Sequence, residues 1–504
     1  MPQDRSADRA RSARPVEGRR ARRSRRPKSE PRRWRQGNIP RAWRQPFAKD
    51  ARARPPKGAR PFWTRARHLL WSWWPWAVVC LWSTGSQRWG LAGATGAMAL
   101  ASYLIAPTEF PPRYGLDHEF TIDSDEFLPT LEGATGVPFV DGNRVEVLNN
   151  GDDFYPAMLQ AIAEARFSIT IEAYIYWAGD IGLKFALALA AKAAAGIKVK
   201  ILLDAIGSAT IGEKIFHTLK TGGCQVAWYN PIHWYTIGRF NRRTHRKSLI
   251  VDGRVAFTGG AGIADQWLGH AQDPDHWRDI QVRLEGPGVT PLQTGFAQNW
   301  LESTGELVSG SWYYPPQEVA GSLRVQTVMS SPQTGASTVR IAYYLSIICA
   351  RRSIYIANPY FVPDQVALDA LIEAKQRGVD VRIMVSGIHN DNWLARHNSV
   401  RLYRRLLEAG IEILEFNRTM LHQKTMVVDG LWATVGTTNF DNRSFAHNEE
   451  SNVCFYDPAM AGELERLFLA DIPDCQRVDL ESWRRRGPLA KVQEFLAAFL
   501  QEQI

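Results

Sequence analysis

The strongest constraint on the fold of this chain is an α/β unit that occurs twice. In its first copy a helical pattern, a short apolar strand, a second helix and a second strand follow one another, at residues 155–165, 168–176, 183–195 and 197–204. The same order returns at residues 341–350, 353–361, 366–377 and 379–386. Strands that alternate with helices favour a mixed, largely buried sheet with helices on both faces. We therefore predict an α/β protein with two pseudo-symmetric lobes, although generic units of this kind also resemble one another by chance.

Both copies carry the same polar motif, His-x-Lys-x4-Asp, and the two copies lie 177 residues apart. Alternate side chains of a strand share one face, so each His projects together with its Lys. Each pair offers a nucleophile or proton carrier beside a fixed positive charge. A single pair is typical of a solvated strand face, whereas two matched copies indicate one functional site. The predicted catalytic residues are the members of the two motifs: His245, Lys247, Asp252, His422, Lys424 and Asp429.

A turn of small residues begins seven residues after each motif Asp, as Gly259-Gly260-Ala261-Gly262 and as Gly436-Thr437-Thr438-Asn439. Such turns let backbone N–H groups approach a phosphate oxygen. Further on, an acid occupies matching positions in the two copies, where it can hold an imidazole in one tautomer. We predict substrate-binding roles for five residues around the motifs: Asn439, Glu450, Asp279, Gly260 and Thr437.

The N-terminal part differs in composition from the rest of the chain. Residues 1–67 hold 23 of the 61 Lys and Arg but only 5 of the 51 Asp and Glu, so the remainder is acidic despite the net charge of +10. This tail has too few apolar residues to offset the entropy of ordering, and we predict that it is disordered. Its charge fits an anionic partner, either a lipid surface or a nucleic acid.

Two apolar runs follow the basic tail, at residues 69–82 and 89–106. Each is shorter than the about 20 residues that a membrane-spanning helix needs, and the first contains Pro75. Their Trp cluster and the neighbouring Arg residues favour a helical hairpin in the membrane at residues 68–107, with the tail and the lobes on the cytoplasmic side. The alternatives are two buried core helices and a secretory signal sequence, which the position of the first run disfavours.

These observations predict five parts: a disordered tail (1–67), a hairpin (68–107), a first lobe (108–315), a second lobe (316–480) and a C-terminal amphipathic helix (481–504). Five scattered cysteines without a Cys-x-x-Cys pair indicate reduced thiols in a cytoplasmic body. One face of the last helix is apolar, which favours packing against a lobe, with contact to a membrane surface as the alternative. That face comprises Leu489, Val492, Leu496, Phe499 and Leu500.

The doubled motif resembles the phospholipase D superfamily, and four surrounding segments resemble bacterial cardiolipin synthases: NRRTHRKSLIVDG at 241–253, WRDIQVRLEGPGV at 277–289, NPYFVPD at 358–364 and NFDNRSF at 439–445. The resemblance covers roughly residues 140–475. It implies a bilobal fold with one active site between the lobes, so that both motifs face a single phosphate. It also implies an enzyme of the bacterial inner membrane that makes cardiolipin from phosphatidylglycerol without a metal or another cofactor.

The chemistry implied by the resemblance proceeds in two steps through a phosphohistidine. Histidine can attack as neutral imidazole and donate as imidazolium, because its ordinary pKa is about 6.5. Lys247 and Lys424 would stabilise charge on the equatorial phosphate oxygens. The family implies His245 as the nucleophile and His422 as the general acid, whereas the spacing of the two motifs is the same.

Other functions would use the same residues. A hydrolase would use water and another transferase a different alcohol. A nucleic-acid phosphodiesterase would hold DNA with the basic tail, but an acidic catalytic body would repel a polyanion, so no nucleic acid is expected as a partner. A binding protein with a degenerate site is suggested only by Gly262, where the family usually has Asn; we expect Gly262→Asn to be tolerated. The sequence leaves the oligomeric state open.

Overall fold

The structure is a computed structural model that describes residues 73–85, 89–104, 115–231, 241–332 and 338–498. The predicted disordered tail lies outside these residues.

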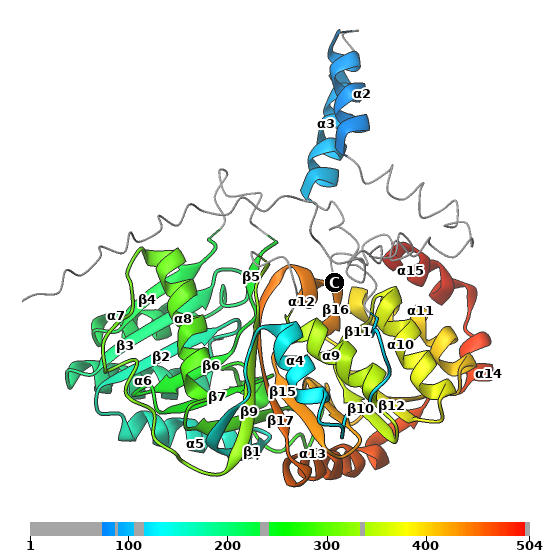
Figure 1. Cartoon of the computed structure of the whole chain (residues 1–504). Helices are drawn as coiled ribbons and strands as arrows, with labels where there is room; N and C mark the ends of the chain where they lie inside the picture. Colours follow the sequence, from blue (N-terminus) through cyan, green and yellow to red (C-terminus); the bar gives the residue numbers. More distant parts are fainter. Residues whose placement is uncertain (1–72, 86–88, 105–114, 232–240, 333–337, 499–504) are drawn as a thin grey trace, which may run out of the picture. The chain divides into compact units, whose positions relative to one another are not determined.

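The first lobe is built on strands in the order β8-β7-β6-β2-β3-β4. The three strands β2, β3 and β4 run parallel, and β6, β7 and β8 continue the sheet in antiparallel pairs. Ile201 and Leu203 of β3 belong to one apolar core and Leu202 belongs to another. Helices α5, α6 and α7 lie on one face of this sheet and α8 lies on the other (Figure 1). The bounds are β2 (Ser168–Ala173), β3 (Lys198–Asp204), β4 (Gln225–Tyr229), β6 (Ser248–Val251), β7 (Val255–Gly259), β8 (Ile280–Glu285), α5 (Gly151–Glu164), α6 (Asp180–Ala194), α7 (Glu213–Thr221) and α8 (Val289–Thr304).

The second lobe repeats this arrangement in the order β17-β15-β14-β10-β12-β13. Again three strands are parallel, β10, β12 and β13, and three follow in antiparallel pairs. Helices α9, α10 and α11 enclose one core, and α13 covers the other face. The duplication predicted from the sequence is therefore confirmed. The bounds are β10 (Ser353–Ala357), β12 (Asp380–Ser386), β13 (Glu412–Phe416), β14 (Thr425–Val428), β15 (Trp432–Gly436), β17 (Asn448–Tyr456), α9 (Thr338–Cys349), α10 (Gln365–Gln376), α11 (Trp393–Glu408) and α13 (Pro458–Asp471).

The two lobes are joined through β1 (Val140–Asn149) and β9 (Leu323–Ser330). β1 pairs with β8 and β9 pairs with β17, and a short antiparallel pairing links β1 to β9. The lobes thus share one continuous sheet, where the sequence predicts a sheet in each lobe. An apolar core that includes Phe296 and Trp300 of the first lobe and Phe455 and Met460 of the second continues across this join.

Both apolar runs near the N-terminus are helical, as α2 (Trp73–Gly85) and α3 (Trp89–Leu104). The two helices lie close together: Cys80 Sγ donates to Ala92 O at 3.2 Å, and a Cβ on Gly96 would lie 3.2 Å from Cys80 Sγ. Leu81 and Trp89 are among the exposed apolar side chains of the pair. Of the helices that the structure describes, none combines the length and the apolar character needed to cross a bilayer.

The C-terminal helix α15 (Pro488–Ala498) lies against α11. Asn398 Nδ2 donates to Ala497 O at 2.8 Å, and Ala497 is buried. Packing against a lobe is therefore confirmed, but Val492, predicted on the packed face, is exposed. The predicted contacts of residues 499 and 500 lie outside the described residues.

Candidate active site

The two motif histidines lie just before equivalent strands, His245 before β6 and His422 before β14. The backbone of each is bound to the other lobe. His245 N donates to Glu449 O at 2.9 Å, and His422 N donates to Arg278 O at 2.7 Å. These matching cross-lobe bonds bring both motifs to the boundary between the lobes.

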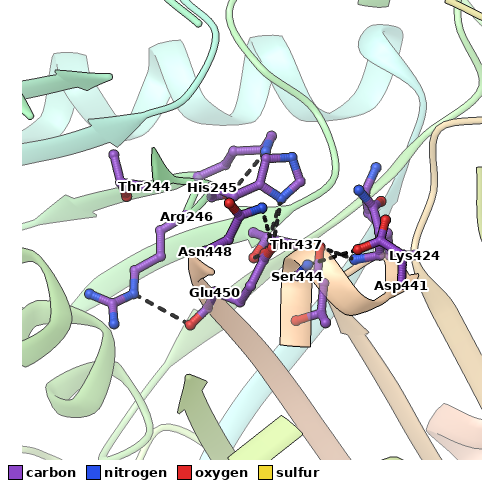
Figure 2. Close-up of polar contacts among 12 residues, drawn as sticks. Thr244, His245, Arg246, Lys424, Thr437, Asp441, Ser444, Asn448 and Glu450 are labelled. Atoms are coloured by element: carbon purple, nitrogen blue, oxygen red, sulfur yellow. Dashed lines mark hydrogen bonds and ion pairs between the residues drawn. The ribbon is translucent and has the colours of Figure 1, made fainter. Parts of the chain in front are cut away.

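Each imidazole is held by an acid of the opposite lobe. His245 Nδ1 lies 3.0 Å from both carboxylate oxygens of Glu450 (Figure 2), and His422 Nδ1 lies 2.8 Å from Asp279 Oδ2. Both acids are completely buried. A bond at Nδ1 fixes the ring and leaves Nε2 as the reacting nitrogen. This contact is the one expected of an acid that holds an imidazole in one tautomer, and the substrate-binding role of Asp279 and Glu450 stays a prediction.

The two acids are oriented by different neighbours. Glu450 Oε2 accepts from Thr437 Oγ1 at 2.6 Å, whereas Asp279 Oδ2 accepts from Trp267 Nε1 at 2.9 Å. Gly260 stands at the position equivalent to Thr437, and a Cβ there would lie 2.3 Å from Asp279 Oδ1. Gly260 is therefore required for the close approach of Asp279, and Thr437 positions Glu450.

At two of the predicted binding residues, the backbone N–H of the turn is bonded within the protein. Gly260 N donates to Ile280 O at 3.3 Å, and Thr437 N donates to Ser451 O at 2.9 Å. Asn439 is different, because its buried Oδ1 has no hydrogen-bond partner in the described part of the chain. Among the three turn residues predicted to bind substrate, Asn439 is the one whose side chain remains available.

Gly262 is closely packed, which corrects the expectation that Asn would be tolerated there. A Cβ at this position would lie 2.9 Å from both Cβ and O of Ile175. Tyr155 OH also donates to Gly262 O at 2.9 Å and fixes the backbone. Ile175 therefore leaves no room for a side chain at residue 262.

The motif lysines are buried beside the imidazoles. Lys424 Nζ lies 3.1 Å from His422 Nε2, and Lys247 Nζ donates to His245 O at 2.9 Å. Burial lowers the pKa of Lys247 to about 7, and the charge of Lys424 lowers it further in the same direction. Burial also lowers the pKa of Lys424 to about 8. Because the charge of Lys424 lowers the pKa of Lys247, the two lysines belong to a single site, and that site favours an anion.

Both imidazoles are neutral at pH 7. Burial lowers the pKa of His245 to about 4 and that of His422 to about 3, and the Lys424 charge contributes at His422. Burial acts to raise the pKa of Asp279, but its hydrogen bond with His422 holds that pKa below the ordinary value. Each ring is thus an uncharged base supported by an ionised acid.

The motif aspartates lie apart from the histidines, the lysines and the acids that bind the imidazoles. The Asp252 carboxylate accepts backbone N–H bonds of 2.7 to 2.9 Å from residues 166, 167 and 168, at the start of β2. Asp429 accepts the equivalent bonds, at 2.7 to 2.8 Å, from residues 351, 352 and 353 at the start of β10. Their predicted catalytic role is therefore corrected to a structural one, because they bind the chain at the opposite end of the strand from the histidine.

Aromatic rings surround the two histidines unequally. The Tyr174 ring meets His245 edge-on with 5.1 Å between ring centres. His422 contacts two indoles, Trp267 at 5.2 Å and Trp277 at 5.6 Å. Sequence reasoning assigned none of these rings, although Trp277 lies two residues before Asp279 and could have been found by that signal. Within the described residues, no three His, Cys, Asp or Glu side chains are grouped as a metal ion would require.

Comparison with known proteins gave matches over both lobes. The family model described as "Cardiolipin synthase, PLD-like domain" matches residues 158–289 and 346–472. A cardiolipin synthase 1 from Bacillus cereus is 33% identical over 368 residues, which cover 71% of this chain and 72% of that protein. A cardiolipin synthase from Geobacillus kaustophilus is 33% identical over 361 residues, with the same coverage. The crystal structure of phosphatidylserine synthase from Haemophilus influenzae Rd KW20 matches with a TM-score of 0.58 at 15% identity, over 75% of this chain and 97% of that one, and supports the fold.

Proposed function

The chain belongs to the cardiolipin synthase family of phospholipase D-like proteins, and on that premise we propose that it moves a phosphatidyl group from one phosphatidylglycerol to a second. The products are cardiolipin and glycerol. The observation that carries the proposal is that each imidazole is bound by an acid of the opposite lobe. This exchange of acids sets two neutral imidazoles and two lysines in one buried site. Such a site suits a covalent route for displacing one alcohol of a phosphodiester by another.

The first step uses the two imidazoles in different roles. Nε2 of one histidine forms a bond to phosphorus as the bond to the glycerol oxygen breaks. The other histidine, whose imidazolium form the bound phosphate anion favours, gives that oxygen its Nε2 proton. Lys247 and Lys424 stabilise the negative charge that develops on the phosphate oxygens. In the second step the hydroxyl of another phosphatidylglycerol gives its proton to the acid–base histidine and displaces the nucleophile.

We assign the nucleophile to His245, the role that the resemblance to the phospholipase D superfamily implies for the first motif. Lys424 Nζ lies 3.0 Å from Nδ1 and 3.1 Å from Nε2 of His422, so its charge acts on the imidazole ring as a whole. His422 is then the residue that protonates the leaving alcohol and later deprotonates the acceptor.

Purified protein incubated with phosphatidylglycerol as the only lipid tests the function. We expect cardiolipin and glycerol to form in equal amounts. Phosphatidic acid as the sole lipid product would identify a hydrolase, and absence of any lipid product with turnover of a nucleic-acid diester would overturn the proposal.

The apolar hairpin supports attachment to the inner membrane, with the lobes on the cytoplasmic side. α2 and α3 expose Leu81, Trp82 and Trp89 at 72%, 58% and 69%, and such a surface is costly to leave in water. A protein held by hydrophobic contact stays with membranes through a high-salt and carbonate wash, whereas a protein held only by its basic tail is released. Complete release would contradict attachment through the hairpin.

A further inference from the structure

Three tryptophans form a continuous aromatic surface beside His422. Trp267 and Trp277 contact the imidazole, and their own ring centres are 4.7 Å apart. Trp177 extends the surface, with its ring centre 6.4 Å from that of Trp277. Among the described residues, the ring that contacts His245 is that of Tyr174. The site is therefore chemically unequal although the lobes are related by duplication.

The polar groups of this surface are mostly committed within the protein. Trp267 Nε1 donates to Asp279 at 2.9 Å, and Trp177 Nε1 donates to Gly207 O at 2.8 Å. Trp277 is half-buried, and its Nε1 makes no hydrogen bond to the described residues. Trp267 is fully buried, so this surface offers the ring faces of Trp177 and Trp277 and one uncommitted N–H donor.

The aromatic surface lies on the His422 side of the site, where the alcohol leaves or enters. In displacement at phosphorus the attacking and leaving atoms lie roughly in line. With His245 attacking, the departing oxygen is on the side of His422, and the incoming hydroxyl must occupy the same place. The aromatic surface therefore borders the position at which either the acceptor alcohol or a water molecule would bind.

We propose that Trp177 and Trp277, backed by the fully buried Trp267, form the binding site of the acceptor glycerol headgroup and exclude water from His422, so that the enzyme transfers the phosphatidyl group instead of hydrolysing it. This inference rests on the proposed function. The carbon-bearing edge of a polyol gains from burial against indole faces, and a hydroxyl can accept from Trp277 Nε1. A water molecule has no apolar surface to bury and finds one donor where it needs several partners.

In the transfer to the acceptor, groups of the site account for every bond and for the proton. The acceptor oxygen forms its bond to phosphorus as the bond from phosphorus to His245 Nε2 breaks, and the acceptor proton passes to His422. Hydrolysis is the same step with water as the nucleophile, and it yields phosphatidic acid. The ratio of phosphatidic acid to cardiolipin therefore measures how well water is excluded.

The test is this product ratio for Trp277→Ala in the full-length protein, with phosphatidylglycerol in mixed micelles. We expect the ratio of phosphatidic acid to cardiolipin to rise at least tenfold among the products formed, whatever the change in the total rate of glycerol release. Trp277→Phe keeps a ring and loses the N–H, so it should stay closer to wild type than Trp277→Ala. Trp177→Ala is the second variant, because the outer ring can be removed without touching His422.

Trp312→Ala is the matched control, since Trp312 is half-exposed and has no place in the site. It should leave the ratio unchanged. Wild-type protein that makes cardiolipin, together with Trp277→Ala and Trp177→Ala proteins that keep the wild-type ratio, would overturn this inference alone. Wild-type protein that makes only phosphatidic acid would instead overturn the proposed function.

Discussion

Single residues distinguish the two halves of the site. Lys424 Nζ lies 3.1 Å from Nε2 of His422, whereas His245 meets an aromatic edge from Tyr174 and an acid at Nδ1. Both rings are neutral because burial lowers their pKa values. The chemistry of the site therefore depends on which nitrogen is open to the phosphate, and that can be tested by trapping the intermediate.

Replacement of either histidine by Ala should abolish cardiolipin formation, since attack and proton transfer are both required. The variants should differ with a phosphatidyl ester of a nitrophenol, whose leaving group needs no proton. His422→Ala should then form an acid-labile, alkali-stable phosphatidyl adduct, and His245→Ala should form none. Mass spectrometry of the protein locates the adduct. An adduct on His422 in the His245→Ala protein would reverse the assignment.

The lysines should give an alkaline limb to kcat/KM. The pKa values of about 7 for Lys247 and about 8 for Lys424 mean that the free enzyme loses positive charge as pH rises through this range. kcat/KM reports the free enzyme and should fall there. A bound phosphodiester anion favours the charged lysines and raises their pKa values, so the limb of kcat should lie at higher pH. A pH profile of kcat/KM that stays flat from about pH 6 to about pH 9 would contradict this.

That the histidines and lysines come together was predictable from the sequence, because two copies of one spacing beside equivalent strands restrict where four side chains can lie. The pairing of each acid with the histidine of the opposite lobe was not predictable from the sequence. Asp279 and Glu450 match by position within each lobe, and only the cross-lobe pairing shows that each serves the histidine of the other. The packing of Ile175 against Gly262 could not be predicted from the sequence either, because it depends on which side chain occupies the space beside Gly262.

At the scale of elements, the strand that follows each histidine is held at both ends. The histidine is bound to the opposite lobe, and the aspartate at the far end is bound to the start of the neighbouring parallel strand. Asp252 and Asp429 both adopt positive φ, 53° and 54°, at the turn into the next strand. The spacing of the motif therefore equals the length of one strand and its turn.

Asp429→Asn should destabilise the protein with little effect on the chemistry of the folded fraction. Asn tolerates positive φ, so the backbone is not strained, but one accepting oxygen becomes an NH2 group that faces a backbone N–H. The expected loss of unfolding free energy is about 2 kcal/mol. Thermal unfolding measures it, and kcat per folded molecule should stay within a few-fold. Asp141→Asn, at an exposed carboxylate, is the control. Loss of kcat at unchanged stability would show that Asp429 has a catalytic role.

At the scale of the whole catalytic body, one sheet and one shared core link the lobes. Two ion pairs, the first with both partners buried, cross the boundary as well. Arg246 meets Glu449 at 2.6 Å, and Arg278 meets Asp471 at 3.0 Å. The joined sheet could not be predicted from the sequence, because β1 and β9 lie outside the repeated units that were recognised. Lobes linked in this way should unfold together.

Glu449→Gln should shift a single unfolding transition. The change leaves the buried Arg246 without its ionised partner, which costs about 3–5 kcal/mol for a buried pair. Calorimetry should show one transition at lower temperature. Glu318→Gln removes an exposed partner of Arg254 and should change the stability by less than about 1 kcal/mol. Two resolved transitions, of which only one moves, would show that the lobes unfold independently.

The pairing of each acid with the histidine of the opposite lobe also means that neither lobe is self-sufficient. A lobe on its own would hold a histidine without its acid and an acid without its histidine, so it would need a second copy of itself to complete either half of the site. The two halves of the present chain meet this need within one molecule, with Asp279 in one and Glu450 in the other.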